Sequence, residues 1–427
     1  MDHLPDELVR AIFCGTVTLP RVVLNRDRVY CLDTNATLAA QPYLLAAVSH
    51  RWREISLATA ELWAYILLFQ RTASRSLIFV KQNLARSGDQ PLVIVLNAVE
   101  SRDQHFGSTL KLLVEHASRR LRVHIKLDKW SPRLHKIQLI QACASCTMPM
   151  LEELVVMHGE LDAQLAVCKS AQLLDCPRLI RLINHVGILT PTTTLGTLKY
   201  LSISMLNTNE APLWAALSMA PALEHLDVYF PEGADGRDED ALVPEHDIHL
   251  SSLTSFAVFG SPPMFAPWTE RLQMPHLQKL TVSIDACDRL SRFFQTIRSS
   301  TLHLILTLEC CGDSGDISAA VVKELRSLRA VSTLEIMGVT GSLSDDGFFH
   351  ALEADARQDS TCWAAQFTQL VFRECFLDSE ATQAVAHFVR TRASAADSGG
   401  DAPRLNVQRI VSSHEEDEVI PDYWSNQ

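Results

Sequence analysis

The sequence of 427 residues has no hydrophobic run long enough to cross a membrane. Its longest uninterrupted apolar stretch, Leu62 to Phe69, is much shorter than the ~20 residues that a membrane-spanning helix needs. The N-terminus is acidic and contains an early proline, whereas a secretory signal peptide begins with a basic and then an apolar segment. We therefore expect a soluble globular protein inside the cell, in the cytoplasm, the nucleus or both.

Neither cysteine nor basic charge is present in a pattern that defines a function. The 11 cysteines are spread thinly without the framework of a disulfide-rich domain, so reduced thiols are expected. A formal net charge of -12 argues against a nucleic-acid-binding protein. The chain has no P-loop and no dinucleotide-binding fingerprint. We therefore predict no cofactor and no nucleic-acid partner.

A local cluster of basic residues surrounds Trp130. In an otherwise acidic chain we interpret it as solvated faces of strands and helices rather than as a nucleic-acid groove. Its members are Arg119, Arg120, Arg122, Lys126, Lys129, Arg133 and Lys136.

The segment from Gly312 to Gly315 has the letters of the nucleophile loop of chymotrypsin-like serine proteases, with Ser314 as the nucleophile. A serine nucleophile also needs an oriented histidine base and a buried acid, and the surrounding sequence is that of repeats rather than of paired β-barrels. A hydrolase is therefore a remote alternative.

Cys143 and Cys146 have the spacing of half a zinc site, and His135 and Cys168 are within reach along the sequence. Structural zinc needs four ligands, and no second matched pair follows. We predict no metal site and interpret these cysteines as core residues on a helix before Pro149.

The stretch from Leu44 to Ile66 predicts a compact helical unit. Its apolar residues recur at spacings of three and four, which is the pattern of one buried helical face. Thr59 is a plausible N-cap for a second short helix, and near the N-terminus Pro5 with two following acids predicts a partner helix. The first face comprises Leu44, Leu45, Val48, Trp52 and Ile55; the second helix adds Leu62 and Trp63, and the partner helix Leu4, Leu8, Ile12 and Phe13.

Three short motifs follow one another in this region: Leu-Pro-x-Glu-Leu from Leu4, Val-Ser-x-x-Trp-Arg from Val48, and Leu-Trp at Leu62. Together they resemble the F-box, a module of a few small helices. The segment from Cys14 to Pro42 is an insertion, longer than the family's usual link and similar to the version common in fungal F-box proteins.

The resemblance implies a partner rather than a reaction. F-box domains dock on the Skp adaptor of a cullin-based ubiquitin ligase and present a substrate held by the rest of the chain. The positions that match the family's adaptor-binding surface are Leu4, Pro5, Leu8, Ile12, Val48 and Trp52. Periodicity alone leaves the alternative open that these residues form a small core against the next domain.

Helix and strand patterns begin to alternate after the helical module. We predict a helix within Gln70 to Arg86, a turn, a buried strand at Leu92 to Leu96 and a helix from Thr109 to Ser118. From Leu121 to Leu127 apolar and basic residues alternate, which predicts a strand with one solvated face.

From residue 148 onward an internal repeat, Leu-x-x-Leu-x-apolar, predicts one strand per copy. Clear copies are Leu151/Leu154/Val156, Leu198/Leu201/Ile203, Leu223/Leu226/Val228 and Leu277/Leu280/Val282; looser copies are Leu179/Leu182, Leu253/Phe256/Val258, Leu302/Ile305, Leu334/Met337/Val339 and Phe367/Leu370/Phe372. Four copies follow a proline, which ends any preceding helix. These prolines are Pro149, Pro177, Pro221 and Pro275.

Several segments between the copies have a helical pattern. They are Asn209 to Met219, Asp288 to Ile297, Ser318 to Leu328, a helix capped by Ser344 and a helix capped by Ser379. This alternation resembles irregular leucine-rich repeats, in which parallel strands line the inside of a curved solenoid. The family's asparagine or cysteine after each strand is mostly missing from this chain, so the number of repeats is not determined by the sequence.

A solenoid of this kind predicts a binding surface on its concave, open strand face and on the loops at the strand ends. Outward-pointing candidates are Glu152, Glu153, Lys199, Tyr200, Glu224, His225, Gln278 and Lys279, with ordinary solvated surface as the alternative for each. Two segments interrupt the pattern: Pro231 to Asp247 is acidic and turn-rich, and Ala393 to Pro403 has the composition of a flexible loop. A final strand is predicted at Leu405 to Val411.

The predicted fold class is therefore α/β: a small N-terminal helical module, residues 1–66, precedes a leucine-rich-repeat-like solenoid with a parallel sheet. Residues 67–147 form a transition, 148–411 the solenoid and 412–427 an acidic tail. We expect a non-catalytic substrate-recognition subunit that binds a Skp adaptor and cullin ligase core through its first helices and an unidentified target protein through its repeats. The alternative is a scaffold in which the same helices cap the solenoid.

Overall fold

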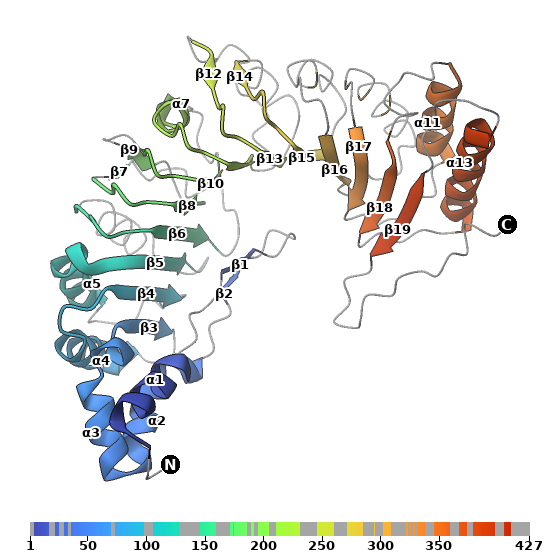
Figure 1. The fold of residues 1–427 in the computed structure, drawn as a ribbon. Helices are drawn as coiled ribbons and strands as arrows, with labels where there is room; N and C mark the ends of the chain where they lie inside the picture. Colours follow the sequence, from blue (N-terminus) through green and yellow to red (C-terminus); the bar gives the residue numbers. More distant parts are fainter. Residues whose placement is uncertain are drawn as a thin grey trace. The chain divides into compact units, whose positions relative to one another are not determined.

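The structure of the chain is a computed structural model. The residues that it describes are 4–16, 22–24, 30–32, 36–69, 73–97, 106–127, 146–158, 171–173, 175–185, 189–191, 195–204, 211–230, 246–259, 271–284, 294, 302–308, 322, 325, 328, 331–337, 346–358, 367–373, 379–397 and 405–410. The chain divides into two compact units, Met1–Asn207 and Thr208–Gln427. Each unit combines helices with parallel strands, so the fold is α/β as predicted (Figure 1).

Unit 1 begins with helices. They are α1 (Asp6–Thr16), α2 (Ala36–Val48), α3 (His50–Ala58) and the short 3-10 helix η1 (Ala60–Trp63), with an antiparallel pair, β1 (Val22–Leu24) and β2 (Tyr30–Leu32), between α1 and α2. We call α1, α2, α3 and η1 the helical module. Its core contains buried side chains from α1, α3 and η1: Val9, Phe13, Ile55, Leu62 and Trp63.

The continuous helical face predicted from Leu44 to Ile55 is wrong, because the chain breaks at Ser49. Ser49 is in extended conformation, and its Oγ accepts the Trp52 N–H at 3.1 Å, so Ser49 is the N-cap of α3. The apolar spacing continues across the break, which is why periodicity did not reveal it. Thr59 precedes η1 as predicted, but its hydroxyl donates to the carbonyl of Ile55 and does not cap η1.

The remainder of unit 1 is a parallel sheet with helices. Its strands pair in the order β3 (Tyr65–Phe69), β4 (Leu92–Asn97), β5 (Arg120–Leu127), β6 (Glu153–His158), β8 (Arg181–Asn184) and β10 (Tyr200–Ser204). The associated elements are α4 (Ala73–Arg86), α5 (Phe106–Glu115), the 3-10 helix η3 (Ala117–Arg119), and a small parallel pair, β7 (Ala171–Leu173) with β9 (Leu189–Pro191). The predicted helices and strands between residues 70 and 127 are thus confirmed, and α4 and α5 lie side by side next to β3 to β5 (Figure 1).

The break predicted after Arg86 is also confirmed. Ser87 N–H still bonds to the carbonyl of Asn83, and Gly88 then adopts a positive φ of 52°, a left-handed conformation that costs glycine little. Gln90 N–H closes the turn on the Ser87 carbonyl, and β4 begins shortly afterwards.

A tight turn precedes the strands in both units. In unit 1 the N–H of Leu151, Leu179 and Leu198 bonds to the carbonyl of the residue three positions earlier. In unit 2 the same bond is made by Leu223, Leu253 and Leu277. In four of these turns the second residue is one of the predicted prolines, whose φ suits that position. All six leucines are 0–1% exposed.

Unit 2 contains a second set of parallel strands. They pair in the order β11 (His225–Tyr229), β13 (Ser255–Phe259), β15 (Lys279–Ile284), β16 (Leu302–Leu308), β17 (Val331–Met337), β18 (Gln369–Arg373) and β19 (Asn406–Ile410). A small pair of strands, β12 (Ile248–His249) and β14 (Leu272–Gln273), is also parallel. The final strand predicted from Leu405 is confirmed as β19.

Two of the looser repeat copies are assigned to the wrong residues. Leu280 of β15 aligns with Leu304 of β16 and not with Ile305. The next strand aligns Leu334 with Leu304, so Leu334 occupies the second position of its copy and not the first. The error arises because consecutive apolar residues in these strands satisfy the repeat in more than one phase.

The helices of unit 2 that the structure describes agree in place with the predicted ones. They are α7 (Ala211–Ser218), α11 (Asp346–Gln358) and α13 (Ser379–Asp397). The last two lie side by side (Figure 1). Buried Phe349 and Phe388 meet between them. The flexible loop predicted from Ala393 is partly wrong, since α13 continues to Asp397.

The strand face that was predicted to be open, and that carries His124 and Glu153 in unit 1, is less polar and less exposed than predicted. His124, expected on a solvated face, is 2% exposed, and Leu67, Val95, Val155 and Ile183 on the same face are buried. In the described part of the chain, no helix is long and apolar enough to cross a membrane.

His185, at the end of β8, is buried, and its Nε2 lies 3.0 Å from the Ser202 hydroxyl. Burial lowers the pKa of His185 from 6.5 to about 3. The unfolded chain therefore binds a proton below pH 6.5 that the folded chain does not, and stability falls as the pH decreases from 6.5 towards 3.

We predict that His185→Gln reduces the acid sensitivity of unit 1. Between pH 7.5 and 5.0 the wild-type free energy of unfolding should fall by about 2 kcal/mol more than that of the variant, as the linkage relation requires. Urea titrations at the two pH values measure this difference. Equal losses in the two proteins would show that folded His185 takes up a proton.

Candidate functional site

The helical module exposes apolar side chains that its own core does not use. On α1, Leu8 and Ile12 are 52% and 41% exposed, and on α2, Leu44 and Val48 are 58% and 61% exposed. We call these four residues the apolar surface of the module. Their exposure contrasts with that of Val9 and Phe13 on the same α1 helix, each 1% exposed.

The predicted adaptor-binding residues fall into two groups. Leu8, Ile12 and Val48 belong to the apolar surface, and Pro5 is also exposed. Leu4 and Trp52 are half-buried against the core of the module, and the Trp52 ring meets the Phe13 ring edge-on at 4.9 Å between centroids. Trp52 is thus a structural residue of the module in addition to any role at its surface. Leu44, which was predicted to be buried, joins the exposed group.

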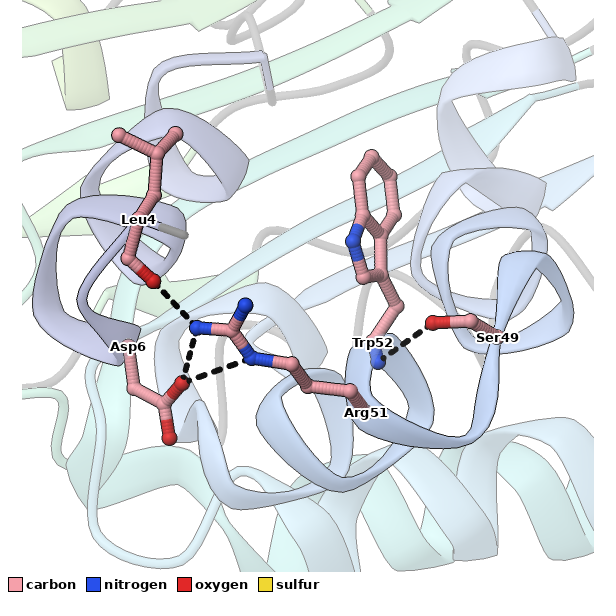
Figure 2. A network of polar contacts seen from close by, with 5 residues as sticks. All are labelled: Leu4, Asp6, Ser49, Arg51 and Trp52. Carbon is pink, nitrogen blue, oxygen red and sulfur yellow. Dashed lines mark hydrogen bonds and ion pairs between the residues drawn. The ribbon is translucent and has the colours of Figure 1, made fainter. Parts of the chain in front are cut away.

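A polar network holds the start of α1 on α3. The Arg51 guanidinium donates from Nη2 to the Leu4 carbonyl and, at 2.7 Å, to Asp6 Oδ1, and its Nε lies 3.2 Å from the same oxygen (Figure 2). The helix of Arg51 is itself fixed by the Ser49 cap to Trp52 that Figure 2 also shows. Because Arg51 and Asp6 are partly exposed, the ion pair contributes only about 0–1 kcal/mol. Its effect is to set the position of α1, and with it Leu8 and Ile12.

The helical module is joined to the sheet of unit 1 through Trp63. Its ring is fully buried, its Nε1 donates to the Ser56 carbonyl at 2.9 Å, and the Arg86 guanidinium of α4 stacks over it at 4.2 Å. Tyr43 meets the same ring edge-on and bonds through its hydroxyl to Asn83 Oδ1 at 3.0 Å. The module, α4 and β3 therefore share one packed region.

The open strand faces carry charged groups that are paired within the face. In unit 1, Glu153 on β6 lies 3.3 Å from His124, 3.7 Å from Arg181 and 3.9 Å from Arg122. Burial alone would raise the pKa of Glu153, but the His124 contact and the two arginine charges outweigh it and lower that pKa. Glu153, a predicted outward residue, is thus a partly buried ion-pair centre.

Unit 2 has a similar arrangement that sequence reasoning missed. Glu335 on β17 is 3% exposed; its carboxylate is 2.7 Å from Arg373 of β18 and 3.2 Å from His303 of β16. The sequence contained one signal of this ion pair, because Glu335 is an acid within an otherwise mostly apolar strand. Of the other predicted outward residues, Lys199, His225 and Gln278 are exposed, while Glu152, Tyr200, Glu224 and Lys279 are partly buried.

The basic cluster predicted around Trp130 is only partly described. Arg119 donates to the Ser87 hydroxyl at 2.8 Å and to the Gln90 carbonyl, and Arg122 belongs to the Glu153 group. The interpretation of a solvated face is wrong for Arg120, which is 2% exposed. Cys146 lies in a bend rather than on the predicted helix and is partly exposed.

The described residues contain no group of three or more His, Cys, Asp or Glu side chains arranged to hold a metal ion. Several predictions lie outside the described residues. They concern Ser314 and its loop, Cys143, His135, Cys168, Lys129, Arg133, Lys136, Trp130, the caps at Ser344, most of Asp288 to Ile297 and Ser318 to Leu328, most of Pro231 to Asp247, and the tail 412–427. Of the insertion from Cys14 to Pro42, the structure describes the end of α1, β1, β2 and the start of α2.

We predict opposite outcomes for two neighbouring substitutions in α1. Leu8→Asp should change the free energy of unfolding by no more than about 0.5 kcal/mol, because the side chain is already in water. Val9→Asp should destabilise the module by about 3 kcal/mol or more, because it buries an unpaired carboxylate. Limited proteolysis and urea unfolding measure both effects. Equal destabilisation would show that Leu8 is part of the core.

No protein-family model matches the sequence, and no curated protein matches it at a significant level. A functional assignment therefore depends on the residues of the chain and on their arrangement.

Proposed function

We propose that the protein is a substrate-recognition subunit of a Skp/cullin/F-box ubiquitin ligase. The observation that carries this proposal is the apolar surface formed by Leu8, Ile12, Leu44 and Val48 on a small helical module that already has a complete core. Three of the four, Leu8, Ile12 and Val48, match positions that the F-box family uses against its adaptor.

The burial pattern supports docking over a purely internal role. A helix that only caps a sheet needs one apolar side, and α1 has that side in Val9 and Phe13. Leu8 and Ile12 are not needed for the core of the module and remain exposed. A partner that buries apolar side chains of this size gains roughly 1.5–3 kcal/mol for each that becomes fully buried.

The repeat strands are proposed to select the target. A protein held by the open strand faces would be brought close to the ubiquitin carrier of the ligase, and the resulting rise in effective concentration requires no chemistry in this chain. The partly exposed side chains that are paired with Glu153 and Glu335 are fixed features of those faces that a target would meet; they are Arg122, Arg181, His303 and Arg373. No catalytic role is proposed for any residue.

The alternative is an interaction scaffold whose helical module closes the β3 end of the sheet. It is favoured by the contacts of Trp63 with Arg86 and of Tyr43 with Asn83, which join the module to α4 beside β3. Those contacts are compatible with both functions, whereas the apolar surface is needed only by the first.

We predict that the purified protein binds a Skp adaptor and that Leu8→Asp or Val48→Asp weakens binding about tenfold or more, because each would bury a carboxylate against an apolar partner. Isothermal titration calorimetry measures the affinity. Ile78→Asp is the matched control, because Ile78 on α4 is as exposed as Val48, at 61%, but lies outside the module.

The control variant should bind like the wild type, and all variants should keep the wild-type unfolding midpoint. A folded wild-type protein that does not bind the adaptor would leave the scaffold as the better description. Equal weakening by all three substitutions would remove the residue assignment.

A further inference from the structure

Arg120, the first residue of β5, is a buried cation that has no carboxylate partner among the residues that the structure describes. Its side chain is 2% exposed, and within the same residues its Nε has no hydrogen-bond partner. The carboxylate of Glu153 on the neighbouring strand is paired with Arg122, His124 and Arg181 instead. A buried guanidinium remains charged at all ordinary pH values, so burial without a counter-charge is unfavourable.

The guanidinium of Arg120 is directed at two sulfur atoms. Its Nη1 lies 3.6 Å from Cys146 Sγ and 3.6 Å from Met148 Sδ. The thioether of Met148 cannot ionise, whereas the thiol of Cys146 can. Cys146 is also partly exposed, whereas Arg120 lies in the interior. A cationic neighbour favours the thiolate, and the thiolate is the nucleophilic form of cysteine.

We propose that Cys146 is a reactive thiol activated by the buried charge of Arg120, and that it is a modification site for small electrophiles such as hydrogen peroxide. In the oxidation, the sulfur attacks one peroxide oxygen; the S–O bond forms, the O–O bond breaks, and hydroxide leaves with the electron pair. The cysteine is oxidised to the sulfenic acid, and the peroxide is reduced. This inference does not depend on the proposed ligase function.

Cys14 and Cys176, whose side-chain surroundings the structure describes, provide internal controls. Cys14 on α1 is exposed, and burial of its sulfur together with the charge of Glu61 raises its pKa. Cys176 precedes β8 and is buried; burial is the main cause that raises its pKa to about 12, with smaller contributions from Cys146 and Asp175. Exposure alone therefore predicts that Cys14 reacts fastest. Activation by Arg120 predicts that Cys146 does.

The test is competitive alkylation of the reduced, full-length protein with iodoacetamide at pH 7, followed by digestion and mass spectrometry of each cysteine peptide. We expect Cys146 to react about tenfold faster than Cys14 and Cys176 to remain unlabelled. Arg120→Met should lower the Cys146 rate about tenfold, and Arg120→Lys, which keeps the charge, should retain most of it. Peroxide followed by dimedone should label Cys146 and not Cys14.

Cys176 reports on folding in every variant, because local unfolding at these turns would expose it to the reagent. If Arg120→Met makes Cys176 reactive, the variant is locally unfolded and the test uses the wild-type protein instead. The alkylation rate of Cys146 at pH 7 is then divided by its rate at pH 9.5. That ratio should be larger for Cys146 than for the free thiol N-acetylcysteine, which has no cationic neighbour. A Cys146 rate no higher than that of Cys14, or a Cys146 ratio equal to that of N-acetylcysteine, would overturn the proposal.

Discussion

Burial of the leucine that ends each turn determines how the strands of both units are aligned. Leu151, Leu179, Leu198, Leu223, Leu253 and Leu277 are 0–1% exposed, and each ends a turn closed by its own N–H. Truncation of such a side chain to alanine typically costs about 2–5 kcal/mol, so a shift of the chain by one residue at any of these turns is strongly unfavourable. Because the next strand begins a residue or two later, the position of the leucine sets which strand residues face inward.

The charged side chains of the open faces follow from this register. Once Leu154 and Leu182 are directed inward, Glu153 and Arg181 on adjacent strands must face the other way and come within reach of one another. The same holds for Glu335 between β16 and β18. A carboxylate in such a partly buried place needs cations or hydrogen-bond donors around it, and in both units arginine and histidine side chains from neighbouring strands surround it. The charge pairs are therefore a consequence of strand alignment.

The sequence predicts a strand correctly where the Leu-x-x-Leu repeat can be aligned on it in only one way. The copies with clear Leu-x-x-Leu spacing each allow one alignment, and their strands lie where predicted. In β16, by contrast, Leu304 and Ile305 are both candidates for the second position of the repeat, and pairing with β15 assigns that position to Leu304. The break at Ser49 was missed for a related reason, since a polar cap that keeps the apolar spacing is not visible as a change of period.

The candidate site shows the same limit. The motifs identified α1 and α2, but the sequence alone could not separate Leu8 from Val9, because both are apolar and lie on adjacent sides of one helix. That separation depends on where α3 and η1 lie, and thus on Trp63 and on the Arg51 contacts to Leu4 and Asp6. The surroundings of Arg120 were also hidden, since they come from Cys146 and Met148, which are distant in sequence.

The way in which the helical module is attached has a consequence for any partner bound to its apolar surface. Trp63 is buried in the module, stacked under Arg86 of α4, and followed at once by β3, whose neighbour β4 is tied to the Ala64 carbonyl through the Val93 N–H at 3.0 Å. There is no intervening segment along which the module could swing without breaking these contacts. A partner bound at Leu8 and Val48 would therefore be held in a fixed relation to the first strands of unit 1. Fixed geometry of this kind suits a protein that acts by positioning, because effective concentration falls when the connection between two bound partners is loose.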